Sequence, residues 1–383
     1  MKVIDTEKIP IKMWLDDIEE GALQQAKNLA NLPFLFKHVA IMPDAHQGYG
    51  MPIGGVIAAN DVIIPNAVGV DIGCGICAIQ TSLKEIKRDT LKKIMGNIRE
   101  LVPVGFKHHK KNRKWSGFEN APDIPIIQAQ LNAARKQLGT LGGGNHFIEI
   151  QKSDKENIWI MVHSGSRNFG LKIANEYHKK ALALCSMWYS ELSSKELAFL
   201  PMKTAEGKEY MEAMNFALEF AKQNRFDMVT AIKSVFHEEF PDITFDDMID
   251  IHHNYAARER HFGENVIVHR KGATSAHKNQ RGIIPGSQGS KSYIVKGKGN
   301  PESFMSCSHG AGRKMGRNQA RRELDLKAEK KFLDEQGIIH SIRGTYDLDE
   351  ATSAYKDISV VMENQKDLVD IIVELTPLGS IKG

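Results

Sequence analysis

Two classes of protein have little support in this sequence: disulfide-stabilised scaffolds and membrane-embedded proteins. Only 4 cysteines occur in 383 residues, too few for a disulfide framework in a chain of this length. No uninterrupted apolar run reaches the ~20 residues that span a bilayer, and the opening residues Met1 to Ile4 do not begin a signal peptide. We therefore expect a cytoplasmic protein with reduced thiols and no membrane partner.

The sequence also lacks a strong excess of charge of either sign. It has 51 Lys and Arg against 47 Asp and Glu, a formal net charge of +4. This balance does not establish a nucleic-acid partner, although it is compatible with a local basic groove. A hydrophobic content of 42% in a chain this long is enough to bury one large core or two smaller ones.

Hydrophobic periodicity predicts alternating strand-rich and helical stretches. Short apolar runs punctuated by Gly, Pro and Asn are typical of strands joined by tight turns, and they occupy residues 39–79, 138–162 and 251–309. Helical spacing with few glycines occurs at 18–31, 172–239 and 313–335. Periodicity does not determine the order of the strands.

Four short segments rich in Gly, Ser or Asn each contain a histidine outside any apolar pattern: Gly144-Asn145-His146-Phe147, Val162-His163-Ser164-Gly165, His252-His253-Asn254-Tyr255 and Ser308-His309-Gly310-Ala311. A fifth segment, from Val70 to Gly75, adds Asp71 and Cys74. Together they supply the imidazole, thiolate and carboxylate donors of a transition-metal site, and their glycines let the backbone approach a ligand closely. The sequence thus predicts a metalloenzyme.

Each of these residues also has a simpler structural explanation. A single histidine such as His163 is more often structural than a metal ligand. On a strand, consecutive side chains point to opposite faces, so at most one of His252 and His253 can enter a given site. Cys74 and Cys77 form a CxxC pair, but a zinc ribbon needs a second pair that the sequence lacks. The placement of all the segments at predicted strand ends or adjoining loops favours the metal site.

Several ordered segments are similar to one protein family: Met42–Gly50, Pro65–Gly75, Leu138–Glu149, His163–Arg167, Arg270–Ala273, Ile284–Ser287, Ser308–Arg313, Ala354–Asp357 and Lys382-Gly383. In them the sequence resembles the RtcB family of GTP-dependent RNA ligases, which join RNA 2′,3′-cyclic phosphate or 3′-phosphate ends to 5′-hydroxyl ends. The resemblance implies an α+β fold with a layered β core surrounded by helices. It implies one ligase domain over residues 1–383, with a helical insertion at about 172–240.

The resemblance also implies that two manganese ions bind to Asp71, Cys74, His146, His163 and His253. Cys74 would bridge the ions, with Asp71 and His146 on one and His163 and His253 on the other. Two nearby cations would strongly depress the pKa of the bridging thiol. The ligand types alone point to zinc, because thiolate and imidazole suit it; manganese follows only from the resemblance.

By the same resemblance, His309 is the nucleophile. A neutral imidazole can attack the α-phosphorus of GTP and expel pyrophosphate. The guanylylated histidine would pass GMP to the RNA 3′-phosphate, and attack by the 5′-hydroxyl would release GMP and close the phosphodiester. Asp44 and His46 lie in a matching segment without being ligands, and a supporting role is implied for them.

Other matching positions surround the nucleotide and the RNA. The implied GTP-binding residues are Asn145, Phe147, Glu149, Asn254, Ser287, Ser292, Ala311, Gly312, Tyr355 and Lys382. Glu149 is suited to accept hydrogen bonds from the guanine N1 and N2 edge, which would favour GTP over ATP. Arg167 and Arg317 match positions near the RNA phosphates, where a guanidinium can bind bidentately.

The run from Lys107 to Trp115 has two interpretations: an RNA-contacting strip with an aromatic platform, or a solvated charged loop. The function likewise has alternatives. A metal-dependent RNA phosphoesterase would need the metals but neither His309 nor Lys382, and a non-catalytic RNA-binding member would tolerate loss of ligands. The physiological RNA, in tRNA splicing or RNA repair, and an accessory activating protein as a partner stay open.

Overall fold

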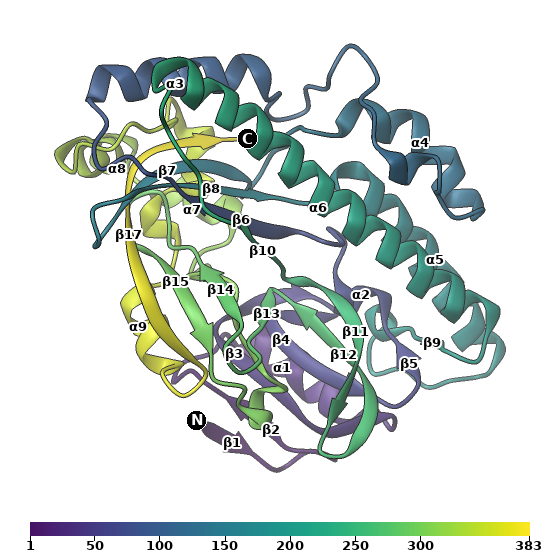
Figure 1. Cartoon of the computed structure of the whole chain (residues 1–383). Helices are drawn as coiled ribbons and strands as arrows, with labels where there is room; N and C mark the ends of the chain where they lie inside the picture. Colours follow the sequence, from purple (N-terminus) through teal and green to yellow (C-terminus); the bar gives the residue numbers. More distant parts are fainter.

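The computed structural model describes all 383 residues as two main β-sheets with helices packed around them (Figure 1). The first sheet has six strands in the order β1 (Lys2–Ile4), β2 (Ile11–Met13), β3 (Leu35–Tyr49), β4 (Met51–Ala59), β12 (Glu264–Lys271) and β11 (Asn254–His261). Its neighbours are antiparallel except β2 and β3. Helix α1 (Glu20–Ala30) packs against β3 and β4, which confirms the helix predicted at 18–31.

The second sheet has seven antiparallel strands and positions the candidate site. Their order is β10 (Ile249–His252), β6 (Gly75–Gln80), β8 (Ile158–Ser164), β7 (Phe147–Ser153), β17 (Val369–Lys382), β15 (Ser292–Gly297) and β14 (Arg281–Ile284). The two edge strands, β10 and β14, contact each other. The sheet therefore curls almost into a barrel.

Strand β8 is buried along its whole length because both faces of its sheet are covered. Alternate side chains point to opposite faces. Ile160 and Val162 share a core with helices α3 (Arg88–Leu101) and α6 (Ala205–Glu239). Trp159 and Met161 share a core with β10, β14, β15 and β17, inside the curl. This explains why the segment is a continuous apolar run rather than an alternating one.

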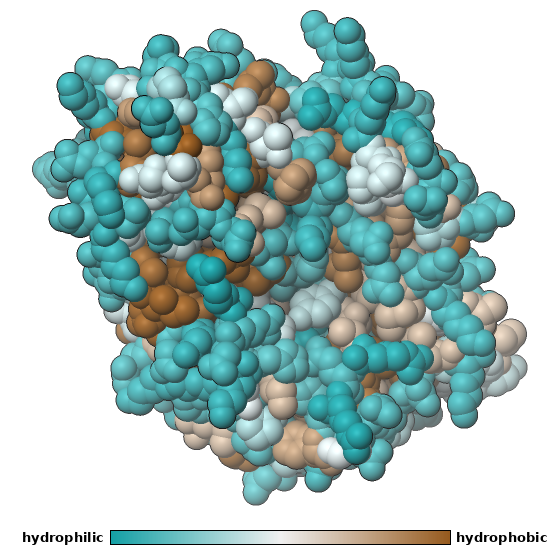
Figure 2. Space-filling view, viewed as in Figure 1, coloured by the Kyte–Doolittle hydropathy of each residue, from teal (hydrophilic) through white to brown (hydrophobic).

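The remaining elements lie around the sheets. They are the strand pairs β13 (Ala273–Ser275) with β16 (Ser306–Ser308) and β5 (Val62–Ile63) with β9 (Leu200–Pro201), and the helices α2 (Pro65–Val68), α4 (Pro125–Gln137), α5 (Arg167–Met187), α7 (Arg317–Glu323), α8 (Leu326–Glu335) and α9 (Ile358–Asn364). None of the helices combines the length and hydrophobicity needed to cross a membrane. On the face shown in Figure 2, hydrophilic residues predominate and a hydrophobic patch lies over β15 and β17.

The predicted α+β class with a layered β core is confirmed. The helical stretch predicted at 172–239 is observed as α5 and α6, joined by a connection that contains β9. That this stretch is an insertion into a ligase domain spanning 1–383 stays a prediction. Helices α2, α3, α4 and α9 were not predicted, and α2 lies within the stretch 39–79 that was predicted to contain strands and turns.

Candidate functional site

Four strands of the second sheet bring the predicted metal ligands Cys74, His146, His163 and His253 together where strand starts meet strand ends. Cys74 directly precedes β6 and His146 directly precedes β7, whereas His163 lies near the end of β8 and His253 follows β10. Because neighbouring strands are antiparallel, the starts of two strands meet the ends of the other two. The register shows this: Gly75 is paired with Ser164 and with His252.

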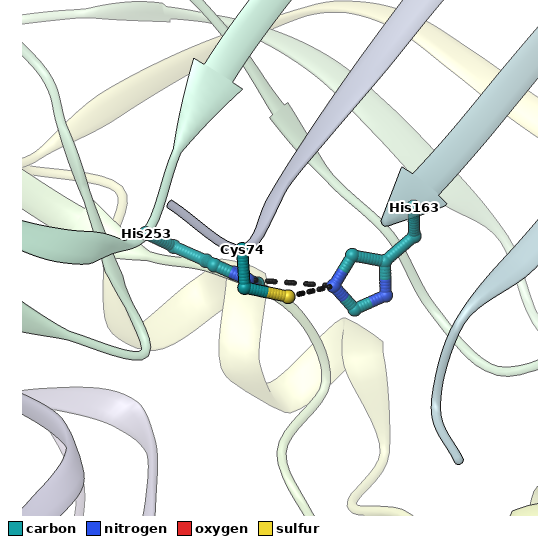
Figure 3. Close-up of side chains that lie close together, drawn as sticks. All are labelled: Cys74, His163 and His253. Carbon is teal, nitrogen blue, oxygen red and sulfur yellow. Dashed lines mark hydrogen bonds between the residues drawn. The ribbon is translucent and has the colours of Figure 1, made fainter. Parts of the chain in front are cut away.

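Cys74 lies between two groups of candidate ligands. Its Sγ is 3.3 Å from Nε2 of His163, which in turn is 3.4 Å from Nε2 of His253 (Figure 3). On the other side, Sγ is 3.4 Å from Nε2 of His146, and that atom is 3.2 Å from Oδ2 of Asp71. The five side chains thus form two three-residue clusters that share the thiol, each compact enough to hold a metal ion. This is the grouping that the resemblance implies.

The adjacent histidine takes no part in the clusters. Nδ1 of His252 lies 3.2 Å from the carbonyl oxygen of Gly73 and 3.2 Å from Nη2 of Arg225. The alternation of side chains along β10 and its continuation therefore separates His252 from His253, as predicted from strand geometry.

Glycines shape the loop that carries Asp71 and Cys74. Gly73 has φ of +73°, a left-handed conformation that other residues adopt at a cost. A Cβ on Gly75 would lie 2.1 Å from the carbonyl oxygen of Ile251, so any larger residue would push β6 away from β10. These two positions hold the thiol at the meeting point of the strands.

The protonation states of the buried side chains in the two clusters suit the binding of cations. Burial lowers the pKa values of His146, His163 and His253, which keeps the imidazoles neutral, the form that ligates metals. Burial acts to raise the pKa of Asp71, but the hydrogen bond from His146 and nearby positive charge outweigh it, and the pKa is lowered. Oδ1 of Asp71 is buried without a hydrogen-bond partner. Such an atom is costly unless a cation or donor meets it.

The thiol behaves differently from the imidazoles. Burial, reinforced by the charge of Asp71, raises the pKa of Cys74 well above its ordinary value. A thiol in this setting stays protonated unless cations bind beside it. The residues present therefore fit a divalent metal in each cluster, and the bridging thiolate would form together with metal binding.

His309 lies beside the clusters but is not part of them. It follows β16, and its ring centroid is 4.7 Å from that of His253. Its Nδ1 is 2.6 Å from Oδ2 of Asp44, and its backbone N–H donates to the same oxygen. Asp44, on β3, is fully buried. The group that Asp44 would support is therefore His309. The carboxylate accepts a hydrogen bond from Nδ1–H of the imidazole, which leaves the lone pair on Nε2.

Most of the predicted nucleotide-binding residues surround one cavity with His309: Asn145, Phe147, Ser287, Ala311, Gly312, Tyr355 and Lys382. Three others do not line it. The side-chain amide of Asn254 is hydrogen-bonded to the backbone: it donates to the carbonyl oxygen of Asp71 and accepts from the N–H of Gly272. Glu149 and Ser292 are buried and both accept hydrogen bonds from Gln151. Their contact with guanine stays a prediction.

The basic residues predicted to bind GTP or RNA lie at the same site. Arg167 begins α5, and its Nη1 is 3.0 Å from Nδ1 of His146. Arg317, at the start of α7, is bonded to Asp349 and Glu350. Lys382 belongs to β17, where it is paired with Phe147 and places its ammonium 5.0 Å from the centre of that ring. The residue is therefore held in the sheet rather than left as a loose end of the chain.

Two residues that the sequence reasoning missed hold the ligand loops together. Asn224 and Arg225, on α6, are both fully buried. The amide of Asn224 accepts from the N–H groups of Gly139 and Thr140 and donates to the carbonyl oxygens of Thr140 and Gly165. The guanidinium of Arg225 is bonded to Asp250 and to the carbonyl oxygens of Gly73 and Ser164. The signal in the sequence is a polar pair on an apolar helix face, between Phe220 and Met228.

Replacing Arg225 by lysine is expected to weaken metal binding about 10- to 100-fold, because outer partners that orient metal ligands have effects of this size. One ammonium cannot bond Asp250 and the carbonyl oxygens of Gly73 and Ser164 in the geometry of a planar fork. Metal titration of the purified protein measures the effect. Arg258→Lys is the matched control, since Arg258 is an exposed residue whose ion pair with Asp61 is at the surface. Equal metal affinity in the wild type and Arg225→Lys would show that Arg225 does not position the candidate metal ligands.

Comparison with known proteins identifies the family of this chain. The model of the family described as "tRNA-splicing ligase RtcB" matches residues 25–383. The "RNA-splicing ligase RtcB" of Escherichia coli strain K12 is 40% identical over 408 residues, covering 100% of this chain and 99% of that protein. The "tRNA-splicing ligase RtcB" proteins of Thermococcus kodakarensis and Pyrobaculum aerophilum are 30% and 31% identical, each covering 98% of this chain and 95% of the relative. Similarity at this level over full length places the chain in the RtcB family of RNA ligases.

Proposed function

We propose that the protein joins RNA ends bearing a 2′,3′-cyclic phosphate or 3′-phosphate to 5′-hydroxyl ends, with GTP as co-substrate and two manganese ions. The observation that carries the proposal is the position of His309. It lies against the metal-ligand candidate His253, and its Nδ1 is engaged by a buried carboxylate. A hydrolytic metal site needs no such histidine, whereas nucleotidyl transfer through a covalent enzyme intermediate needs a nucleophile beside the metals.

The first step transfers GMP to the histidine. Asp44 accepts the hydrogen bond from Nδ1–H of His309, so the Nε2 lone pair attacks the α-phosphorus of GTP. The bond from the α-phosphorus to the bridging oxygen breaks, and pyrophosphate leaves. Asp44 then stabilises the positive charge that develops on the imidazole ring, as a buried carboxylate does for a catalytic histidine. When bound, manganese ions held by Asp71, Cys74, His146, His163 and His253 would neutralise charge on the transferring phosphate.

The next two steps use the RNA ends. An oxygen of the RNA 3′-phosphate attacks the phosphorus of the bound GMP, the N–P bond breaks, and His309 regains its lone pair. The 5′-hydroxyl oxygen then attacks the RNA 3′-phosphorus and expels GMP, and the hydroxyl proton is lost as the phosphodiester closes. A cyclic phosphate must first be hydrolysed to the 3′-phosphate. Arg167 and Lys382 supply positive charge beside the site for these anions.

A joining assay tests the proposal against the phosphoesterase alternative. The protein is incubated with manganese, an RNA ending in a 2′,3′-cyclic phosphate and a second RNA beginning with a 5′-hydroxyl, with and without GTP. We expect a joined product only when GTP is present. Conversion of the cyclic phosphate without joining, at the same rate with and without GTP, would identify a phosphoesterase instead.

The affinity for GTP is expected to fall as the pH drops below about 7. Burial raises the pKa of Glu149 to about 7, partly offset by the charge of Lys382. A raised pKa means that the carboxylate able to accept from guanine N1 and N2 exists only above that pH. Well below it, the dissociation constant should rise about tenfold per pH unit. Calorimetric titration of GTP at several pH values measures this.

Glu149→Gln is expected to bind GTP weakly at every pH and to show no such dependence, because its amide does not titrate. Glu374→Gln, on the same sheet in an exposed ion pair with Lys291, is the control and should keep the wild-type profile. An unchanged pH profile in Glu149→Gln would remove Glu149 from guanine recognition.

A further inference from the structure

A cleft of about 880 Å³ adjoins the cavity that contains His309. The two share Arg317 and Lys382. The rest of the cleft is formed by the end of α3, the loop that follows it, Gly143 and Gly144, α7 and the segment 341–350. Helices α3, α7 and α8 and the chain's C-terminus gather in this part of the molecule (Figure 1). An extended ligand lying in the cleft would therefore reach the reactive histidine.

The cleft has an excess of basic side chains. Six line it, Arg99, Lys107, Arg317, Arg321, Arg343 and Lys382, against three acidic ones, Asp347, Asp349 and Glu350. The acidic groups already have partners. Asp349 and Glu350 accept from Arg317, Arg321, Arg313 and Tyr355, and Asp347 accepts from the backbone N–H groups of Arg343 and Gly344. The remaining positive charge is thus available to a ligand.

Three of the basic residues have no carboxylate within 4 Å of their charged side-chain group: Arg99, Lys107 and Arg343. Arg99 is half-buried and donates to the hydroxyl of Ser341. Burial lowers its pKa, and the neighbouring charge of Arg343 lowers it further. Arg99 and Arg343 line the same cleft without a carboxylate on either guanidinium, so a bound anion can stabilise both charges, and guanidinium geometry suits a phosphate.

Exposed aromatic rings accompany these charges. Phe106, in the loop after α3, is 96% exposed, and Tyr346 is 71% exposed with the guanidinium of Arg321 3.9 Å from its ring centre. Both line the cleft. Exposed rings beside a basic groove are the platforms on which single-stranded nucleic acid stacks its bases. Trp115, by contrast, packs on Phe118, Phe216 and Phe220, so its ring is not free to act as the aromatic platform of the first interpretation of the run from Lys107 to Trp115.

We propose that this cleft binds the single-stranded RNA segment next to the reacting end, with phosphates on Arg99, Arg343 and Lys107 and a base stacked on Phe106. The proposal rests on the proposed RNA-joining function and adds the path of the strand to it. The single strands that lead to the two RNA ends have the same chemistry, a phosphodiester backbone and unpaired bases. The experiment therefore uses one probe for each end.

The test measures binding of two fluorescent single-stranded RNA oligomers by the full-length protein with manganese: one ending in a 3′-phosphate and one beginning with a 5′-hydroxyl. We expect the double variant Arg99→Ala, Arg343→Ala to bind at least one probe about tenfold or more weakly. The salt dependence of log Kd for that probe should become shallower by about 1.4, or ~0.7 per phosphate contact. Phe106→Ala should weaken the same probe about 5- to 150-fold without changing the salt slope.

The control is the double variant Arg260→Ala, Arg281→Ala, which removes the same charge from exposed residues outside the cleft. It should bind both probes within about twofold of the wild type. Wild-type affinity of the cleft variants for both probes would overturn the proposal.

A second measurement separates this proposal from the function on which it rests. Labelling by GTP with radioactive α-phosphate, in the absence of RNA, should be the same in the cleft variants and the wild type. Normal labelling with unchanged RNA affinity would refute the cleft alone. Absence of labelling in the wild type would refute the proposed function. Loss of labelling only in the cleft variants would make the cleft part of the nucleotide site and would also overturn the RNA assignment.

Discussion

Replacing His309 by alanine is expected to abolish covalent capture of GMP and to reduce RNA joining by on the order of 10⁴- to 10⁶-fold, the loss that follows removal of a covalent nucleophile. The imidazole is the nucleophile candidate because Asp44 occupies Nδ1 and leaves Nε2 free beside His253. Incubation with manganese and GTP labelled at the α-phosphate measures the capture. The label should be stable to alkali and lost in acid, as a phosphorus–nitrogen bond is.

Asp44→Asn separates nucleophilic attack from mere binding. An amide in place of the carboxylate can no longer stabilise a charged imidazole, and it can present an N–H to Nδ1, which favours the wrong tautomer. By analogy with the corresponding change in a Ser-His-Asp triad, we expect labelling to slow by up to about 10⁴-fold. Manganese content should stay unchanged, since Asp44 belongs to neither ligand cluster.

His277→Ala is the control for both changes. His277 is an exposed histidine outside the cavity, and its replacement should label like the wild type. Undiminished label on His309→Ala would show that another residue carries GMP, and the proposed reaction would fail at its first step.

The convergence of the proposed metal ligands follows from features that can be read from the sequence. The positions of Cys74 and His146 just before strands and of His163 near the end of one are visible in the alternation of apolar runs and glycines. Antiparallel neighbours bring the start of one strand next to the end of the other. The α+β class was predicted on the family resemblance. The order of the strands was not, because the β17–β7 and β10–β6 pairings join segments more than 150 residues apart in the sequence.

What could not be predicted are contacts decided by packing between distant segments. Asp44 and His309 are 265 positions apart, so a sequence can mark Asp44 as supporting but not name the group it supports. Asn224 and Arg225 interrupt the apolar face of α6. Their role is explained only by the packing of α6 against the loops to which they donate hydrogen bonds. Phe106 and Trp115 flank the same charged run. Only the aromatic side chains of α6 and its neighbours decide that Trp115 is packed and partly buried whereas Phe106 is exposed.

Cys74 is shared by both clusters, so it is the proposed ligand whose loss is expected to cost the most metal. Its Sγ belongs to both clusters, whereas each of the other four ligands belongs to one. We therefore expect Cys74→Ala to lower the bound manganese from the proposed two ions per chain to fewer than one. GMP capture and RNA joining should fall together, by at least about 10³-fold, because charge on the transferring phosphate is no longer neutralised. Elemental analysis after gel filtration measures the metal, and the labelling and joining assays measure the rest.

Cys77→Ala is the matched control for this prediction. Cys77 is also buried, on β6 only three residues further along, yet it belongs to neither cluster and shares a core with Ile79 and Ile160. Its replacement removes a small buried side chain and should cost about 1 kcal/mol of stability at unchanged metal content. If Cys74→Ala kept both its manganese and its activity, Asp71 and the three histidines would have to hold the ions without a bridge, and the two-cluster arrangement would no longer explain the site. If Cys77→Ala also lost its metal, the effect of Cys74→Ala would reflect disruption of β6 rather than loss of a ligand.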